Sequence, residues 1–216
     1  MSQEAQPRRR YDRSRRQAQA EATQREIVRV AHDQFVANGY GATTVVAIAA
    51  AAGVSVPTVY AGFPTKADLL RRAIEVAFAG DDAPLAVADR PTAQWVAETD
   101  DPVELLGRYA EMCGELASRA GRIYGVLAAA ADADPTLAEL LDTFEGQRLK
   151  AARQIAMAVR DRGGLPAGTS LEQARDLIWI ANSPELFTLA VKRRWSLERY
   201  VVFVRRTLLQ IVEVAR

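Results

Sequence analysis

The sequence predicts an all-α protein, and three features support this prediction. Apolar residues recur at the three- and four-residue spacing that places them on one face of a helix. Ser, Thr, Asp, Gly and Pro stand where these apolar patterns start and stop, as helix caps do. No segment shows the apolar–polar alternation of a half-buried strand bounded by turn residues. The 216 residues, 49% hydrophobic and 25% charged, suffice for one large domain or for a small domain joined to a bigger one.

Several classes of protein are not expected from this composition. No apolar run approaches the roughly 20 residues that span a bilayer. The first ten residues, MSQEAQPRRR, carry arginines with no apolar stretch behind them, unlike a secretory signal. The single cysteine, Cys113, cannot form an internal disulfide, so we expect a cytoplasmic protein.

The net charge of +1 conceals an uneven distribution of charge. Residues 1–79 contain eleven Lys and Arg against seven Asp and Glu, whereas the remaining residues carry a small acidic excess. The first sixteen residues are the most basic, with arginines at 8, 9, 10, 13, 15 and 16 against Glu4 and Asp12. A basic end on a near-neutral body indicates a polyanionic partner, although a solvated tail has the same composition.

Four elements are predicted in the N-terminal part. Residues 1–20 read as a basic arm, disordered in its first part, and residues 21–79 as a small helical domain. A helix from Glu21 ends at Asn38-Gly39, and a short one over 44–52 is stopped by Gly53. Ser55 caps a helix over 56–62, and Thr65 caps a fourth helix that ends near Phe78.

A linker over 80–101 is predicted to lead into a larger helical domain over 102–216. Its first helix ends at Gly121 and a short helix follows. Asp134-Pro135 then begins a long helix that ends at Gly163-Gly164. Another helix begins near Ser170 and is interrupted at Ser183-Pro184. Ser196 caps the last helix.

The sequence TVVAIAAAAGVSVPTVYAGF, residues 44–63, predicts a helix-turn-helix. Two short helices that cross steeply need a small residue at their contact, a tight turn and an apolar residue that packs back. Ala49, Gly53 and Val59 supply these, and Gly53 suits a turn with positive φ. A helical hairpin within a bundle would satisfy the same spacing, but the basic arm just before it favours a DNA-binding role.

These residues resemble the DNA-binding domain of the TetR family of transcriptional repressors. The likeness covers residues 21–79 and keeps the family's order and spacing throughout. Pro57 stands where Gly is commonest, and Gly62 stands where a larger side chain is frequent. The matching residues are Phe35, Gly39-Tyr40, Thr43-Thr44, Ile48-Ala49, Ala52-Gly53-Val54-Ser55, Thr58-Val59-Tyr60, Phe63 and Lys66.

The resemblance implies a role in DNA binding for several of these positions. Thr44, Tyr60 and Lys66 would hold phosphates, while Val56, Pro57 and Thr58 would meet base edges. Thr43 and Ser55 are expected at the backbone or at phosphates, or simply as N-caps. In the arm, Arg8, Arg9 and Arg10 would enter a minor groove or follow phosphates. The resemblance assigns Phe35, Ile48, Ala49, Val59 and Phe63 to the core of this domain.

The C-terminal part resembles the family chiefly at its end, in WIANSPELF (179–187) and RWSLERY (194–200). The last helix has an apolar stripe, and further apolar residues lie outside it, so it must bury more than one face. The resemblance implies a homodimer through the last two helices. The stripe is Leu197, Val201, Val204, Leu208, Ile211 and Ala215, and the others are Tyr200, Val202, Phe203 and Leu209.

Family members usually hold a small molecule among their middle helices. Few ionisable residues lie on the predicted inward faces, so an apolar or aromatic ligand is expected. For each candidate lining residue taken singly, core packing is the favoured interpretation. These candidates are Tyr109, Met112, Cys113, Tyr124, Phe144, Trp179 and Phe187.

Nothing in the sequence indicates an enzyme, a metal site or a cofactor. His32 and Cys113 are far apart, and no Gly-rich phosphate loop is present. The sequence therefore predicts a sequence-specific regulator of transcription, a repressor released from a double-stranded operator by a small molecule. The alternative is a helical adaptor that holds an acidic partner or a membrane surface with its basic arm.

Overall fold

The computed structural model describes residues 7–80 and 98–213, and every regular element within those ranges is a helix. The prediction of an all-α fold is therefore confirmed. The chain divides into two units, residues 1–73 and 74–216, and the division falls inside one helix. Of the predicted linker over 80–101, residues 81–97 lie outside the described residues, as do residues 1–6 and 214–216.

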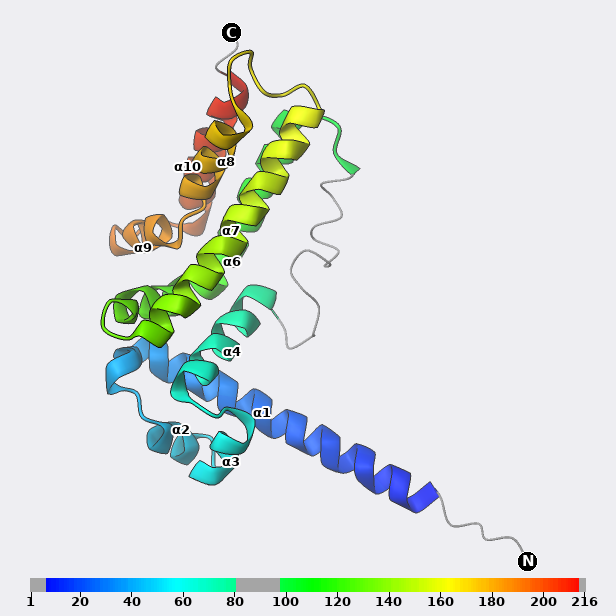
Figure 1. The fold of residues 1–216 in the computed structure, drawn as a ribbon, viewed down its shortest axis with the longest axis vertical. Helices are drawn as coiled ribbons and strands as arrows, with labels where there is room; N and C mark the ends of the chain where they lie inside the picture. The colour runs from blue at the N-terminus through cyan, green and yellow to red at the C-terminus, as the bar shows by residue number, and fades with distance from the viewer. Residues whose placement is uncertain (1–6, 81–97, 214–216) are drawn as a thin grey trace, which may run out of the picture. The chain divides into compact units, whose positions relative to one another are not determined.

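The first unit contains α1 (Pro7–Ala42), α2 (Val45–Ala51), α3 (Val56–Gly62) and the start of α4 (Lys66–Ala79) (Figure 1). Inside α1 the helical backbone breaks at Gly39, with φ 79°, where the sequence predicts the helix to end. Its beginning differs from the prediction, because the helix starts at Pro7 rather than at Glu21. Gln, Ala, Arg and Glu are good helix formers and need no apolar face to continue a helix.

Local capping sets the bounds of the three shorter helices. Thr44 caps α2, and Ser55 caps α3, each through its side-chain oxygen. The predicted capping arrangement of α4 is also confirmed. The Asp68 amide donates to Thr65 Oγ1 at 3.0 Å, and the Thr65 amide donates to Asp68 Oδ2 at 3.1 Å.

The five residues predicted to form the core of this unit are all buried: Phe35, Ile48, Ala49, Val59 and Phe63. Phe35 and Ile48 are completely shielded from solvent. Ile27 adds apolar area from α1, and Leu69 and Leu70 add apolar area from α4. Burial of side chains from all four helices holds elements that are individually too short to be stable in water.

The second unit contains the end of α4 and five further helices, with α6 and α7 side by side as the longest pair (Figure 1). α6 contacts α7, α9 and α10, and α8 contacts α7 and α10. Asp134 and Ser183 cap α7 and α9, and Ser170 forms a capping box at α8. The five helices are α6 (Pro102–Ala131), α7 (Pro135–Asp161), α8 (Leu171–Ala181), α9 (Pro184–Lys192) and α10 (Leu197–Glu213).

The predicted break at Gly121 is wrong, because α6 runs through it without interruption. A Cβ atom at Gly121 would lie 2.5 Å from a ring carbon of Phe187. This glycine therefore admits the Phe187 ring from α9 against the α6 backbone. The sequence pattern alone does not distinguish a glycine that ends a helix from one that permits such a close contact.

No single helix of the described residues is long and apolar enough to cross a membrane. α2 and α3 satisfy the criteria of length and composition only together, and they are bent by 105°.

Candidate nucleic-acid interface and regulatory core

The two short helices α2 and α3 are joined by a tight turn. Gly53 has φ 67°, the left-handed conformation that glycine adopts without strain. The Val54 amide donates to the Ala49 carbonyl at 3.0 Å and closes the end of α2. The bend of 105° between the helices lies in the range of helix-turn-helix motifs, and Ala49 and Val59 are buried in this unit.

α3 presents a polar and small-residue face to solvent. Pro57, Thr58 and Tyr60 are exposed and Val56 is half-buried, whereas Val59 alone turns into the core. The Ser55 hydroxyl accepts from the Thr58 amide at 3.3 Å and lies 2.8 Å from the Thr58 hydroxyl. Ser55 is thus an N-cap that also orients Thr58, and the exposed face is free to enter a groove.

The two threonines before α2 have different surroundings. Thr44 is exposed, and its side-chain oxygen accepts from the Ala47 amide at 3.1 Å, which leaves its proton available to a phosphate. Thr43 is 2% exposed, and its hydroxyl donates to the Gly39 carbonyl at 2.8 Å. The Thr43 side chain thus satisfies a carbonyl left free by the break in α1, and its expected contact with DNA stays a prediction.

Lys66 closes the turn between α1 and α2. Its ammonium nitrogen donates to the carbonyls of Tyr40 at 2.9 Å and Thr43 at 3.1 Å, and lies 4.0 Å from the centre of the Tyr40 ring. These two bonds use two of the three hydrogens of the ammonium group, and the expected phosphate contact stays a prediction. Lys66 has a structural role in addition to any role at DNA.

In the predicted basic arm, the side chain of Arg15 is among the described residues and those of the preceding arginines are not. Arg8, Arg9 and Arg10 belong to the helical backbone of α1, but their side chains lie outside the described residues. Arg15 is described and is exposed. The expected contact of the arm with a minor groove therefore stays a prediction.

The predicted ligand-lining residues all lie in the second unit. Five of them are buried, Tyr109, Cys113, Tyr124, Phe144 and Phe187, while Met112 and Trp179 are half-buried. They form two aromatic groups rather than one. Tyr124 and Phe144 pack with Phe78 of α4 at ring-centre distances of 6.0–6.3 Å, and Phe187 packs edge-on against Tyr200 at 5.1 Å.

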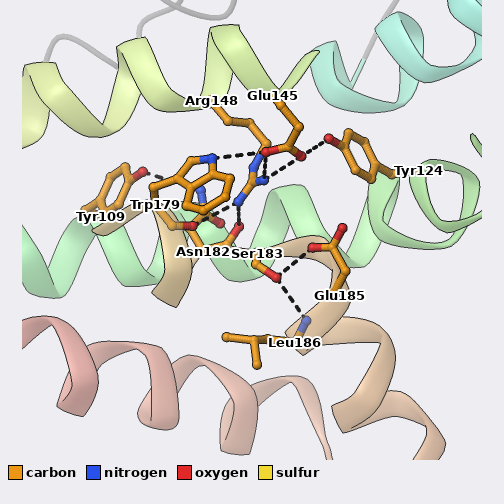
Figure 2. Close-up of polar contacts among 9 residues, drawn as sticks. All are labelled: Tyr109, Tyr124, Glu145, Arg148, Trp179, Asn182, Ser183, Glu185 and Leu186. Carbon is orange, nitrogen blue, oxygen red and sulfur yellow. Dashed lines mark hydrogen bonds and ion pairs between the residues drawn. The ribbon is translucent and has the colours of Figure 1, made fainter. Parts of the chain in front are cut away.

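The interior of this unit also contains an ion pair that the sequence analysis missed (Figure 2). Arg148 donates to both carboxylate oxygens of Glu145 at 2.6 and 2.7 Å, with side chains only 11% and 25% exposed. The Tyr124 hydroxyl and, at 3.0 Å, the Trp179 indole donate to the same carboxylate. The expectation of few ionisable residues on the inward faces is therefore wrong at these two positions.

Arg148 also ties this network to the end of α8. Its second terminal nitrogen donates to the carbonyls of Trp179 at 3.0 Å and Asn182 at 2.9 Å. These carbonyls lie in the last turn and at the C-cap of α8, where backbone acceptors lack intrahelical partners. The side-chain amide of Asn182 donates to the Tyr109 hydroxyl at 3.4 Å. One network therefore joins α6, α7 and the junction of α8 with α9 (Figure 2).

Burial raises the pKa values of the weakly acidic side chains in this core. Burial raises the pKa of the Cys113 thiol to about 12 and raises the pKa of the Tyr109 hydroxyl beside it. Burial also raises the pKa of Tyr124, with the Glu145 carboxylate adding to the effect, and that of Tyr200. All four groups therefore stay protonated and uncharged near neutral pH.

The outer surface of this unit carries an amphipathic groove along α10. It encloses about 250 Å³ between aromatic and cationic side chains. Trp195 lies edge-on to Phe203 at 5.8 Å, and Arg199 stacks on the Trp195 ring at 4.3 Å. The lining residues are Trp195, Arg199, Val202, Phe203, Arg206, Thr207 and Gln210.

The steep α2–α3 pair, the exposed face of α3 and the helical second unit together define a helix-turn-helix regulator fold. Residues 27–73, which contain the helix-turn-helix, match the model of the TetR family of bacterial regulatory proteins. No curated protein sequence matches the chain significantly.

Solved structures extend the likeness to the whole fold. A TetR-family regulator from Agrobacterium tumefaciens has a TM-score of 0.68 and 14% identity, covering 89% of this chain and 99% of its own. The fatty acid degradation regulator FadR from Bacillus halodurans has a TM-score of 0.66 and 20% identity, covering 88% and 94%. FadR from Bacillus subtilis in complex with stearoyl-CoA has a TM-score of 0.64 and 17% identity, covering 87% and 97%.

Proposed function

We propose that this protein is a sequence-specific transcriptional regulator, a cytoplasmic homodimeric repressor that a small apolar or aromatic effector releases from its operator. The observation that carries the proposal is the exposed face of α3, Pro57, Thr58 and Tyr60, presented on a helix bent by 105° from α2. A helix of this size and polarity fits the major groove of DNA.

The expected contacts divide into positioning and reading contacts. Thr44, at the N-terminus of α2, and Tyr60, on α3, would hold phosphates that flank the groove. Val56 and Pro57 would make apolar contacts with thymine methyl groups, and Thr58 would meet a base edge. Ser55 acts through Thr58, which its cap orients. The Lys66 ammonium and the arginines of the arm would add electrostatic affinity that falls with salt.

In place of the predicted pairing of the last two helices, α9 and α10, the proposed dimer uses the apolar surface of α8 and α10, two helices that contact one another. Leu177 and Ile180 on α8 are 44% and 52% exposed, and Val202 and Phe203 on α10 are 42% and 37% exposed. Large apolar side chains gathered on neighbouring helices are typical of a subunit interface. A second copy that paired these helices crosswise would bring Arg199 and Arg206 towards Glu172 and Asp176 of α8, and Asp176 would then be shared with its neighbour Arg175.

The effector would bind in the second unit, where the aromatic residues gather. The similar FadR structure from Bacillus subtilis is a complex with stearoyl-CoA, a molecule with a long apolar chain, which supports an effector with an apolar part. A ligand changes DNA binding only if it has different affinities for the two conformations of the protein.

The test is fluorescence anisotropy of the purified protein with DNA from beside its own gene, with unrelated DNA for comparison, across a salt series. Tyr60→Phe removes a single hydroxyl, and Thr58→Val removes another on the reading face. Both should weaken specific binding several-fold, whereas Thr136→Val, an exposed threonine in the first turn of α7, should have no effect. Weak and equal binding to both DNAs, unchanged in the variants, would favour the adaptor instead.

A further inference from the structure

The polar groups inside the second unit are almost completely paired with one another. The Glu145 carboxylate accepts from Tyr124, Trp179 and Arg148, and Arg148 gives its remaining terminal hydrogens to two backbone carbonyls. The Tyr109 hydroxyl accepts from Asn182. Such a network is satisfied by the protein alone and leaves no strong unmet demand for a ligand.

The Tyr200 hydroxyl is the exception. Of the buried side-chain nitrogen and oxygen atoms among the described residues, it is the one without a hydrogen-bond partner. Tyr200 is 1% exposed, and it belongs to the first turn of α10 and to the same apolar cluster as Tyr109, Cys113 and Phe187. A buried hydroxyl without a partner destabilises the folded protein relative to phenylalanine at the same position.

Phe187 of α9 borders Tyr200 in this core. The Phe187 ring lies edge-on to Tyr200 and is seated against the α6 backbone at Gly121. Phe187 belongs to α9, a helix of nine residues that is separated from α8 by the break at Asn182–Ser183. A ligand could reach the Tyr200 hydroxyl only if α9 shifted and moved the Phe187 ring, so the inference below requires this shift.

The charge of such a ligand is limited by the groups nearby. Arg148 is already bonded to Glu145, so a ligand carboxylate would lose its hydration without gaining a free cation. A cationic ligand would likewise find Glu145 occupied, and the Glu185 carboxylate is exposed and accepts from the Ser183 hydroxyl. A tyrosine hydroxyl is a good donor to an uncharged carbonyl or ether oxygen, and the walls of the cluster are apolar.

We infer that the effector is an uncharged and largely apolar molecule whose oxygen accepts a hydrogen bond from the Tyr200 hydroxyl, beside Phe187 and Cys113. This inference rests on the proposed function, since it names the class of molecule that the regulatory core would bind. Tyr200 is then retained for recognition although it is unfavourable for the stability of the free protein.

The first part of the test compares stability. Tyr200→Phe should leave the urea midpoint of the free protein equal to or above that of wild type. Tyr124→Phe is the matched control, because its hydroxyl donates to Glu145, and it should lower the midpoint. A fall for Tyr200→Phe as large as that for Tyr124→Phe would mean that the Tyr200 hydroxyl is already paired, and would overturn the inference.

The second part measures binding of three probes of similar shape by ligand-observed NMR. Acetophenone carries an uncharged acceptor, α-methylstyrene replaces that oxygen with a methylene group, and benzoate is anionic. Wild type should bind acetophenone at least several-fold more tightly than the other two, and Tyr200→Phe should lose this preference. Equal binding of all three, no binding of any, or a preference unchanged in Tyr200→Phe would overturn the inference. Operator binding by the free protein, measured on the same samples, tests the proposed function separately.

Discussion

Cys113 is completely buried, and its thiol has a pKa of about 12 because the charged form would lack solvent. The thiolate is the reactive form of cysteine, so this thiol should be inert in the folded protein. We expect Ellman's reagent to modify Cys113 very slowly in the native state and within seconds in 6 M guanidinium. Because the chain has a single cysteine, the absorbance reports this site alone. Rapid modification of the folded protein would contradict the described burial.

The same burial predicts how stability depends on alkaline pH. Cys113 has a pKa raised from 9.0 to about 12, and Tyr109, Tyr124 and Tyr200 also have raised pKa values. Above pH 9 the unfolded chain loses these protons before the folded protein does, so stability should be full below pH 9 and fall as pH rises. Each group contributes at most about 1.4 kcal/mol per pH unit.

Urea unfolding at pH 8, 9, 10 and 11 measures this dependence. Cys113→Ala removes one of the titrating groups, so its stability should fall less steeply than that of wild type between pH 9 and 11. Identical slopes for the two proteins would show that the Cys113 pKa is the same in the folded and unfolded states.

At the scale of elements, the contact of α6 with α10 depends on a helical glycine. A Cβ atom at Gly114 would lie 2.3 Å from Val201 Cγ2, and a β-branched side chain has little freedom to move away. Gly114→Ala should therefore destabilise the protein by about 1–3 kcal/mol. Gly146→Ala on α7 is the control, since nothing lies within 4 Å of its Cβ, and it should stabilise by about 0.5–1 kcal/mol. Differential scanning calorimetry distinguishes the two, and stabilisation by both would contradict the close packing.

The network around Arg148 links α7 to the end of α8 and, through Glu145 and Tyr124, to α6. Arg148→Met removes four hydrogen bonds and leaves the Glu145 charge without its cation. Because Glu145 is 25% exposed, water offsets part of the loss, and we expect a cost of about 2 kcal/mol. Arg108→Met, which breaks the exposed pair with Glu104, should cost under about 0.5 kcal/mol. Urea denaturation of both variants checks the difference, and equal costs would mean that the inner pair is fully hydrated.

Where the fold follows from contacts close in sequence, the sequence predicts it well. Ser55, Thr65 and Ser170 each satisfy an amide three residues ahead, so the starts of their helices are visible in the local pattern. Gly53 likewise marks the turn of the helix-turn-helix.

Where the fold depends on distant partners, the local pattern fails. Gly121 resembles a helix stop until Phe187 is placed against it. Glu145 looks like an ordinary surface residue, and its bond to Trp179 spans 34 positions. The spacing of Glu145 and Arg148 on one helix face, next to the apolar Phe144, is the one local feature that could have indicated an inward ion pair.

For the whole molecule, the proposed repressor must be a dimer, because two recognition helices have to reach successive major grooves about 34–36 Å apart. Phe203 is the test position, since it is 37% exposed within the α10 groove, where its ring lies edge-on to Trp195. Phe203→Glu would place a charge at the centre of the proposed interface. Leu149→Glu on α7 is the matched control, because Leu149 is also 37% exposed but does not line that groove.

Phe203→Glu should shift the protein from dimer to monomer in sedimentation velocity, and Leu149→Glu should leave it a dimer. A monomer offers one recognition helix and loses the advantage of two linked contacts, so its affinity for a two-half-site operator should fall by at least about a hundredfold. Its binding to a single half-site should change little, because α3 is untouched. If Phe203→Glu remains dimeric and keeps its operator affinity, the interface lies on another face, and the pairing of α8 with α10 between copies is wrong.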